Sequence, residues 1–202
     1  NIFSFQTQKL MTTLGEGGAI TTDDKDAADK LRDIRHFGGE NNWGSNYKMT
    51  KIQAAVGLVQ LSRLDEMNRR RREAAHRRTD LLKGVAELTL PFEPPHYKHI
   101  YYTYSMLVQP GWAGDKRDRI ISTMRDKFGI MCSISNPPQY LRWPYISQHC
   151  EYQELEVSEN IGRRLFNVML HPLLTEEQEL YICASLLETI ESIKKESGAL
   201  AS

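Results

Sequence analysis

The sequence has few cysteines, no excess of either charge and no long apolar run. Its cysteines, Cys132, Cys150 and Cys183, are odd in number, widely spaced and never paired as CxxC, which argues against a disulfide framework or a structural zinc site. Basic and acidic residues each number 26, so net charge favours neither nucleic acid nor an anionic membrane as a partner. No apolar run approaches the roughly 20 residues of a membrane span, and the first residues lack the order of a signal peptide. We expect a cytoplasmic protein without a metal.

The residues that are present indicate an ordinary globular polypeptide in two parts. At 202 residues, 40% hydrophobic and 26% charged, the chain suffices for one large or two modest domains. A proline-rich stretch over 90–99 separates the parts. Before it, apolar spacing and capping residues predict a strand at 19–22 and helices over 24–37, 51–64 and 65–84. After it they predict strands at 101–109 and 129–134, a loop rich in proline and aromatics, and helices over 115–128, 159–170 and 176–195. Asp23 and Asp24 are expected to cap the first of all these helices, and Thr175 the last.

The helices of the first part lack a sheet to pack on. Helical spacing predicts one buried face from Ile52, Val56, Val59 and Leu64 and another from Met67, Ala74, Leu81 and Leu82. Apolar helix faces require an apolar partner, yet this part contains a single predicted strand. We therefore expect that another chain supplies the sheet or that the sequence is the later part of a longer polypeptide.

Lys9 lies in a polar loop that can be read in two ways. Hydroxyl residues and glycines surround it, namely Ser4, Thr7, Thr12, Thr13, Gly15, Gly17 and Gly18. Such a segment can bring backbone amides and hydroxyls against a phosphate while an amine stays nearby. An amine that attacks a carbonyl must be neutral, so it needs desolvated or cationic surroundings. From residue types alone, a catalytic Lys9 and an ordinary solvent-exposed lysine both remain open.

Five segments, in their order and spacing, carry a resemblance to one family. They are "SFQTQKLMTTLGEGGAITTDD", "LRDIRHFG", "NYKMTKIQAAVGLVQLSRLDEMNRRRR", "FGIMCSISNPP" and "LFNVMLHPLLTEEQ". The sequence resembles the later portion of the DegT/DnrJ/EryC1/StrS family of sugar aminotransferases, which are pyridoxal-phosphate (PLP) enzymes. The resemblance implies an α/β fold, with residues 1–88 forming the C-terminal part of the large PLP-binding domain of PLP-transferase fold type I. Residues 89–202 would form the small C-terminal α/β domain.

The resemblance also implies a cofactor site. Lys9 stands where the family's lysine forms a Schiff base with pyridoxal 5′-phosphate and then moves a proton between substrate and cofactor. Ser4 matches the hydroxyl that binds the cofactor phosphate. Lys48 lies in a loop that, in the family, reaches across a dimer interface toward the partner's cofactor phosphate, at a position usually held by Arg or Asn. A lysine there is a point charge without arginine's planar fork. From the residues alone, Lys48 can also be a solvated lysine before a helix cap.

Three further residues are assigned to the substrate side by the same resemblance. His99 and Tyr102 match a His- or Tyr-bearing strand near the substrate. Asn136 occupies the loop where many members carry a His-Tyr-Pro sequence, and this departure prevents a substrate from being borrowed from the commoner sugar aminotransferases. Asn136 can also simply cap the turn at Pro137 and Pro138.

The implied reaction is amino-group transfer from glutamate or glutamine to a keto sugar, usually nucleotide-linked in this family, or to a keto cyclitol. The implied assembly is a homodimer. Family members are about twice as long, and a missing N-terminal half or companion chain would supply the aspartate that pairs with the pyridine nitrogen, the ring-stacking aromatic and the first phosphate-binding loop. We therefore predict that these 202 residues alone are inactive and poorly stable.

Three other functions compete with this one. Dehydratases of the same family replace the cofactor lysine by histidine, so Lys9 argues against them. A non-catalytic regulatory or scaffolding relative could bind ligand without turnover. The basic run Arg69 to Arg72, with Arg77 and Arg78, suggests nucleic acid. On a helix, however, these residues spread around most of the circumference among acidic residues, which favours a solvated face or a nucleotide-phosphate contact over DNA binding.

Overall fold

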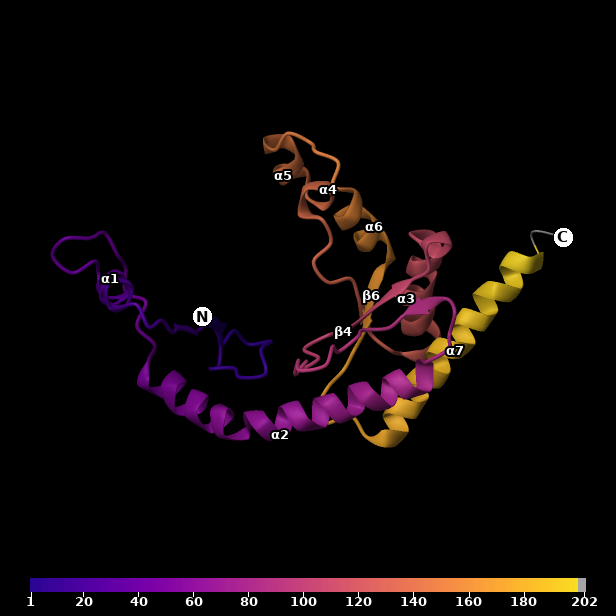
Figure 1. Ribbon diagram of the computed structural model, residues 1–202, viewed down its shortest axis with the longest axis horizontal. Helices are drawn as coiled ribbons and strands as arrows, with labels where there is room; N and C mark the ends of the chain where they lie inside the picture. Colours follow the sequence, from indigo (N-terminus) through magenta and orange to yellow (C-terminus); the bar gives the residue numbers. More distant parts are fainter. Residues whose placement is uncertain (200–202) are drawn as a thin grey trace. The chain divides into compact units, whose positions relative to one another are not determined.

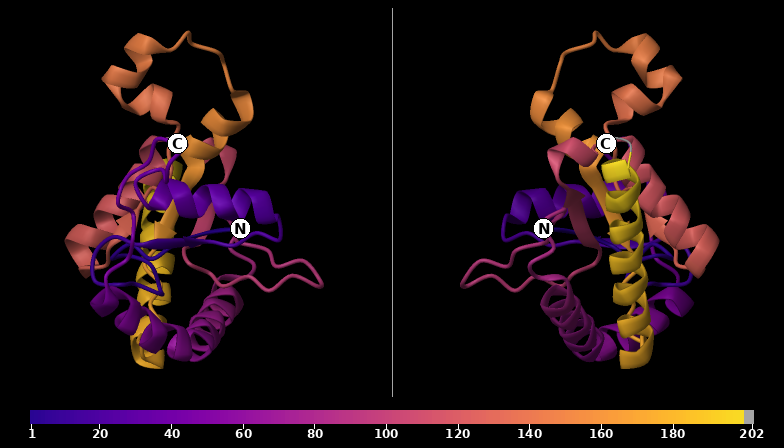
Figure 2. Two further views of the ribbon diagram at one scale, coloured as in Figure 1. Left: turned by 90° about the vertical axis from the view of Figure 1, so that its left-hand side faces the viewer. Right: turned by 90° about the vertical axis from the view of Figure 1, so that its right-hand side faces the viewer.

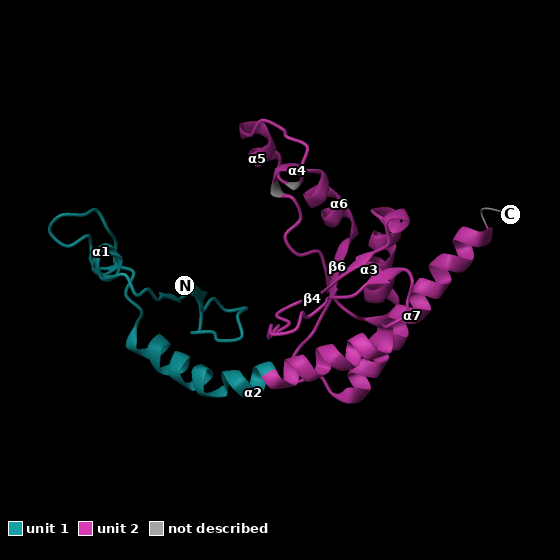
Figure 3. Cartoon of the chain, viewed as in Figure 1, with its two compact units in different colours: residues 1–68 teal, residues 69–202 magenta. Residues whose placement is uncertain are grey.

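The computed structural model describes residues 1–199 and divides the chain into two compact units (Figure 3). Unit 1 spans Asn1–Asn68 and unit 2 spans Arg69–Ser202. The division falls inside helix α2 (Lys51–Leu82), so one helix contributes its first part to unit 1 and its last part to unit 2. The expected domain boundary after residue 88 concerns the domains of a longer protein and stays a prediction.

Unit 1 opens with a two-stranded sheet followed by a capped helix. Strand β1 (Ile2–Ser4) pairs antiparallel with β2 (Gly18–Ile20). Helix α1 (Lys25–Arg35) begins where the capping residue predicted, since the Asp24 carboxylate accepts the Ala27 N–H at 3.0 Å. Such a cap satisfies one of the four free N–H groups at a helix start. The strand between residues 19 and 22 was predicted, whereas β1 was not.

Helix α2 is one continuous helix, whereas the sequence predicted two, over 51–64 and 65–84. Its start is a capping box, because Thr50 Oγ1 accepts the Gln53 N–H at 3.3 Å while Gln53 Oε1 accepts the Thr50 N–H at 3.1 Å. Neither proline nor glycine stands near Asp65, so nothing interrupts the backbone hydrogen-bond ladder there. The prediction of two separate helices was therefore wrong.

Unit 2 is built on a four-stranded antiparallel sheet in the order β3–β4–β6–β5. Its strands are β3 (Leu88–Thr89), β4 (Tyr104–Val108), β5 (Cys132–Ser133) and β6 (Leu165–Val168). Beyond the end of α2, its helices are the 3-10 turn η1 (Pro110–Trp112), α3 (Asp115–Phe128), α4 (Gln139–Arg142), α5 (Pro144–His149), α6 (Glu156–Arg164) and α7 (Glu176–Ala199). Helices α3 and α7 lie side by side (Figure 1, Figure 2).

The two long helices of unit 2 beyond α2 agree with the sequence. Helix α3 has the predicted bounds and ends at Gly129, whose φ of 67° is left-handed, as expected for a helix C-terminus. Helix α7 starts at the predicted cap, since the Gln178 N–H donates to Thr175 Oγ1 at 3.2 Å. Within residues 1–199, no helix combines the length and the apolar content that crossing a membrane requires.

The connection from β5 to β6 differs from the prediction. The proline- and aromatic-rich stretch contains the short helices α4 and α5 rather than a plain loop. The helix predicted over 159–170 ends at Arg164, and the following residues form strand β6. Pairing with β4 places Phe166 and Val168 among the buried residues of the core. This tertiary gain outweighs the local helical spacing on which the prediction rested.

The hydrophobic core described by the structure lies in unit 2. One face of the sheet presents Tyr104, Met106, Val108, Phe166 and Val168, and helices cover it with Ala75, Leu82, Ile120, Met124, Leu186 and Ile190. Burying each large apolar side chain contributes roughly 1.5–3 kcal/mol. Among the described residues, every member of this core belongs to unit 2.

Unit 1, by contrast, leaves large apolar side chains exposed. On the face of α2 that the sequence predicted to be buried, Ile52 is 73% and Val59 is 57% exposed. On the later part of the helix, Ala74 and Leu82 are buried as predicted, whereas Leu81 is exposed. Val56 and Leu64 of the early face are half-buried. Within this chain the predicted early face is therefore only partly covered, and the prediction fails at Ile52 and Val59.

Candidate active site

The Ser4–Lys9 segment is a tight turn that follows strand β1. The Lys9 N–H donates to the Gln6 carbonyl at 2.8 Å, and the Gln8 N–H donates to Gln6 Oε1 at 2.8 Å. Ser4 Oγ accepts the Gln6 N–H at 3.4 Å, which leaves the hydroxyl hydrogen of the exposed Ser4 able to donate outward. Lys9 is half-buried. The turn therefore fixes the backbone that carries the two residues.

Backbone bonds close this loop at its base. The Phe5 N–H donates to the Gly17 carbonyl at 2.7 Å, and the Thr13 N–H donates to the Phe5 carbonyl at 3.0 Å. A Cβ on Gly17 would lie 2.4 Å from Thr13 Oγ1, so only glycine permits this approach. Thr12 Oγ1 is buried without a hydrogen-bond partner among the described residues. The closed loop thus presents an amine and several hydroxyls on a backbone with little freedom.

Lys48 contacts its own unit. Its Nζ lies 2.7 Å from His36 Nδ1 and 5.2 Å from the centroid of the Phe37 ring. A cation over a ring face is attracted by the ring quadrupole. The loop before Lys48 is compact, since a Cβ on Gly38 would lie 1.7 Å from the Asn42 carbonyl oxygen. Its predicted role toward a partner's cofactor stays a prediction.

His99 and Tyr102 lie on one segment of unit 2. The His99 N–H donates to Glu93 Oε1 at 2.9 Å, and the Tyr102 carbonyl accepts from Arg71 Nη1 at 3.0 Å. Asn136 lies elsewhere, in a bend before α4, with a left-handed φ of 46°. The structure therefore brings together Ser4 with Lys9, and His99 with Tyr102. Lys48 and Asn136 stand on segments of their own.

Sequence reasoning missed the arginines and the carboxylate behind His99. Arg71 and Arg78 are buried, so the prediction of a solvated arginine face is wrong for these two residues. Glu93 accepts from Arg72 Nη1 at 2.6 Å. That hydrogen bond is the largest cause that lowers the pKa of Glu93 to about 2. The only signal in the sequence was one acidic residue among the prolines of the 90–99 stretch.

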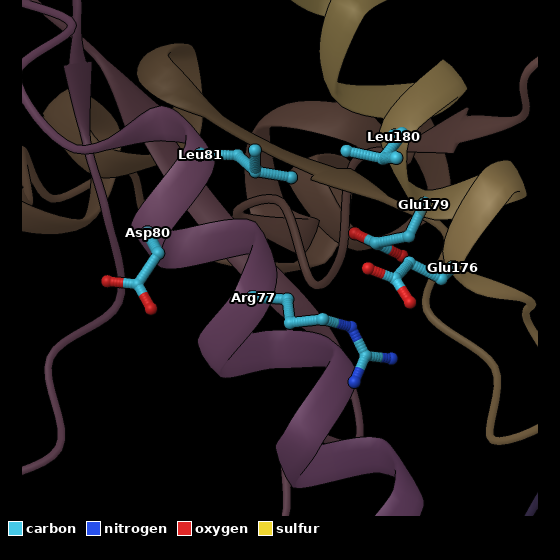
Figure 4. A pocket seen from close by; sticks show the side chains of 6 residues that line it. All are labelled: Arg77, Asp80, Leu81, Glu176, Glu179 and Leu180. Atoms are coloured by element: carbon cyan, nitrogen blue, oxygen red, sulfur yellow. The ribbon is translucent and has the colours of Figure 1, made fainter.

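The hollow drawn in Figure 4 does not involve the predicted residues. It has a volume of about 180 Å³ and is lined by Arg77, Asp80, Leu81, Glu176, Glu179 and Leu180. Figure 4 shows the Arg77 side chain from α2 and the carboxylate of Glu176 from α7 on opposite sides of it. A neighbouring hollow is lined by Arg70, Glu73, Arg77, Pro172, Leu173, Leu174 and Thr175. Neither hollow contains a residue that the sequence assigned to the site.

Comparisons with known proteins agree with the resemblance seen in the sequence. The sequence profile of the DegT/DnrJ/EryC1/StrS aminotransferase family matches residues 1–187. Spore coat polysaccharide biosynthesis protein SpsC of Bacillus subtilis is 32% identical over 194 residues, which cover 87% of this chain and 49% of SpsC. GDP-perosamine synthase of Caulobacter vibrioides is 34% identical over 192 residues, which cover 91% of this chain and 50% of the synthase.

A solved structure supports the same assignment. DesV of S. venezuelae, in complex with a ketimine intermediate, has a TM-score of 0.83 and 26% identity, and the match covers 93% of this chain and 50% of DesV. The chain spans about half the length of the relatives it matches. The predicted α/β fold is confirmed, because the chain matches solved aminotransferase structures with a TM-score of 0.85. Because the family profile matches residues 1–187, the chain belongs to the DegT/DnrJ/EryC1/StrS aminotransferase family.

Proposed function

We propose that this chain is part of a PLP-dependent sugar aminotransferase. It would take the amino group of glutamate or glutamine and transfer it to a keto sugar, nucleotide-linked, or to a keto cyclitol. The observation that carries the proposal is the closed loop in which Lys9 follows Ser4 by five residues and precedes the glycines. A half-buried amine beside hydroxyls is what covalent carbonyl chemistry next to a phosphate requires.

The residues of the loop fit pyridoxal phosphate chemically. Lys9 is half-buried and supplies a primary amine for an aldehyde carbon. The Ser4 hydroxyl, exposed and bonded through its oxygen only weakly at 3.4 Å, can donate to a phosphate oxygen. Thr12 Oγ1, buried and without a partner among the described residues, is a further group that a bound molecule could satisfy.

The side chains of the loop would divide the work. Bound pyridoxal phosphate supplies an electron-withdrawing ring that stabilises charge at the amino donor's α-carbon. Lys9 Nζ would hold the cofactor and, once the donor amine has displaced it, would move a proton between the donor's α-carbon and C4′ of the cofactor. Ser4 would hold the phosphate through its hydroxyl. His99 and Tyr102 would contact the sugar on the opposite half of the reaction.

The active protein would contain more than this chain. Its relatives are about twice as long, and α2 exposes Ile52 and Val59, which an additional segment can cover. We propose that the further half supplies the partner of the pyridine nitrogen and that two copies associate, with Lys48 serving the partner's site.

Borohydride reduction tests the proposal. The protein is purified from its natural source, reduced and digested, and the modified peptide is located by mass spectrometry. We expect a phosphopyridoxyl group on Lys9, none in Lys9→Arg, and an unchanged adduct in the matched control Lys25→Arg on the exposed start of α1. A wild-type protein without the adduct, or Lys9→Arg with its biological activity unchanged, would overturn the proposal in favour of a scaffolding relative.

A further inference from the structure

The segment 93–102, which carries His99 and Tyr102, is held by a network that nothing in the local sequence predicts. Arg72 Nη1 donates to Glu93 Oε1 and to the His99 carbonyl, both at 2.6 Å. Glu93 Oε1 also accepts the His99 N–H at 2.9 Å, and Glu93 Oε2 lies 3.2 Å from His76 Nε2. The Glu93 carboxylate, only 15% exposed, therefore joins helix α2 to the backbone of His99.

The backbone of this segment is strained where it turns. Tyr101 has φ of 48° and is 3% exposed, a conformation that L side chains seldom adopt and that the surroundings must enforce. Arg71 Nη1 donates to the Tyr101 carbonyl at 3.2 Å and to the Tyr102 carbonyl at 3.0 Å. Two neighbouring arginines of α2 thus hold consecutive parts of the turn.

The turn also selects one tautomer of His99. The Tyr101 N–H donates to His99 Nδ1 at 2.8 Å, so Nδ1 carries no proton and a neutral ring bears its hydrogen on Nε2. The His99 ring packs against the Tyr101 ring, with 4.3 Å between the two ring centroids. His99 as a whole is nevertheless exposed. His99 consequently offers a hydrogen-bond donor of fixed direction.

We propose that Glu93 and Arg72 are positioning residues for the acceptor sugar, because they hold the strained turn that fixes His99 as an Nε2–H donor and sets the place of Tyr102. The inference rests on the proposed function, in which these two residues face the sugar. It adds Arg72 and Glu93, two residues of unit 2 to which the proposed function gives no part in the amino donor's chemistry. A carboxylate that accepts hydrogen bonds from a guanidinium and a backbone N–H together restricts the movement of the residue that carries this N–H.

Measuring the two halves of the reaction separately distinguishes a role in positioning the sugar from a general structural role. Conversion of the cofactor by glutamate alone is followed by absorbance in the native holoenzyme, and amination of the keto sugar is followed separately. For Glu93→Gln and for Arg72→Lys we expect the glutamate half to stay within about twofold, while KM for the sugar rises on the order of ten- to a hundredfold. Glu93→Asp should recover part of the loss. The matched control is Glu196→Gln on α7, where an exposed carboxylate accepts a hydrogen bond from Arg119 of α3.

A second readout does not depend on activity. Nitrogen-15 NMR of labelled histidines, with His99 assigned from a His99→Gln spectrum, should show the Nε2–H tautomer in the wild type and tautomer exchange in Glu93→Gln. Equal losses in both halves of the reaction, an unchanged sugar KM, or a tautomer unaffected by Glu93→Gln would each overturn the inference. A wild type that fails the glutamate half overturns the proposed function instead, and the tautomer measurement still decides the role of Glu93.

Discussion

Arg78 on α2 and Glu179 on α7 form a doubly hydrogen-bonded ion pair in the interior of unit 2. Nε lies 2.5 Å from Oε1 and Nη2 lies 2.9 Å from Oε2, and each side chain is only 1% exposed. Arg78 also donates to the carbonyls of Val168 and Met169 at 3.0 and 2.9 Å. A single guanidinium therefore ties two helices to the end of β6, across about a hundred residues of sequence.

Removing one partner of this ion pair should lower the free energy of unfolding substantially. In Glu179→Gln, a buried guanidinium loses its counter-charge, and such changes destabilise proteins by about 3–5 kcal/mol. Urea unfolding of the purified protein measures the difference. The matched control is Glu188→Gln on the same helix, whose partner Lys127 is exposed, so the expected loss there is about 0–1 kcal/mol. Similar losses in the two variants would show that the pair carries no special share of the stability.

The glycine at the base of the cofactor loop gives a second prediction. Gly17→Ala places a Cβ 2.4 Å from Thr13 Oγ1, so the loop must open and Lys9 must shift. We expect the borohydride adduct on Lys9 to fall on the order of tenfold, since even a 1 Å misplacement of a reacting group is expensive. The control is Gly111→Ala, where an added Cβ meets nothing within 4 Å. An unchanged adduct in Gly17→Ala would mean that the loop tolerates a wider base.

Local sequence signals correctly predicted the elements whose stabilising contacts lie within the element itself. Helix α3 and the N-caps Asp24 and Thr175 follow from side-chain chemistry within one turn, and no distant partner is needed to form them. Strand β6 could not be predicted in the same way. Its four residues follow a helical pattern, and only pairing with β4 decides for the strand.

The residues of the candidate site differ in the same way in how far the sequence predicts them. Lys9 and Ser4 stand five residues apart, so the family resemblance carried by one short segment selected them as candidates, although the residue types alone left the role of Lys9 open. Glu93 gave no comparable signal, because its contact with Arg72 spans 21 residues and depends on where α2 passes the segment. Sequence patterns report chemistry carried by one segment, whereas contacts between segments need the fold.

Acid should weaken the Glu93 network over a defined range. The hydrogen bond from Arg72 is the largest cause of the pKa of Glu93 being lowered to about 2, from an unfolded value of about 4.3. A carboxylate whose pKa is lower when folded stabilises the protein above its unfolded pKa, and this contribution is lost as pH falls through the folded pKa. The stability that Glu93 adds should be complete above pH about 5 and shrink toward pH about 2.

Comparison with Glu93→Gln isolates that contribution from other carboxylates. Urea unfolding at pH 7, 4 and 2.5 gives the difference in free energy of unfolding between wild type and variant. We expect the difference to be largest at pH 7 and smallest at pH 2.5, with Glu196→Gln showing a smaller change because that carboxylate is exposed. A difference that stays constant with pH would mean that Glu93 acts through packing rather than through its charge.

The proposed role of Lys48 in a partner's site predicts complementation between two inactive variants. Lys9→Ala removes the attaching amine, and Lys48→Ala removes the charge proposed to reach the other subunit. If Lys48 acts across a two-fold dimer, a mixed dimer holds one site with both groups intact, whereas neither parent dimer holds any. Equal mixing makes about half of the dimers mixed, so about a quarter of the wild-type activity should appear.

The measurement is aminotransferase activity after denaturing, mixing and refolding the two variants, with each variant refolded alone as the baseline. Lys48→Arg is the conservative control, because arginine keeps the charge and adds a planar fork suited to phosphate, and it should remain active by itself. Mixtures that never exceed the baseline would place Lys48 in its own subunit's site or outside any site. If Lys48→Ala by itself then keeps full activity, Lys48 lies outside any site, and its contact with His36, at 2.7 Å, closes the loop that precedes α2 and is its whole role.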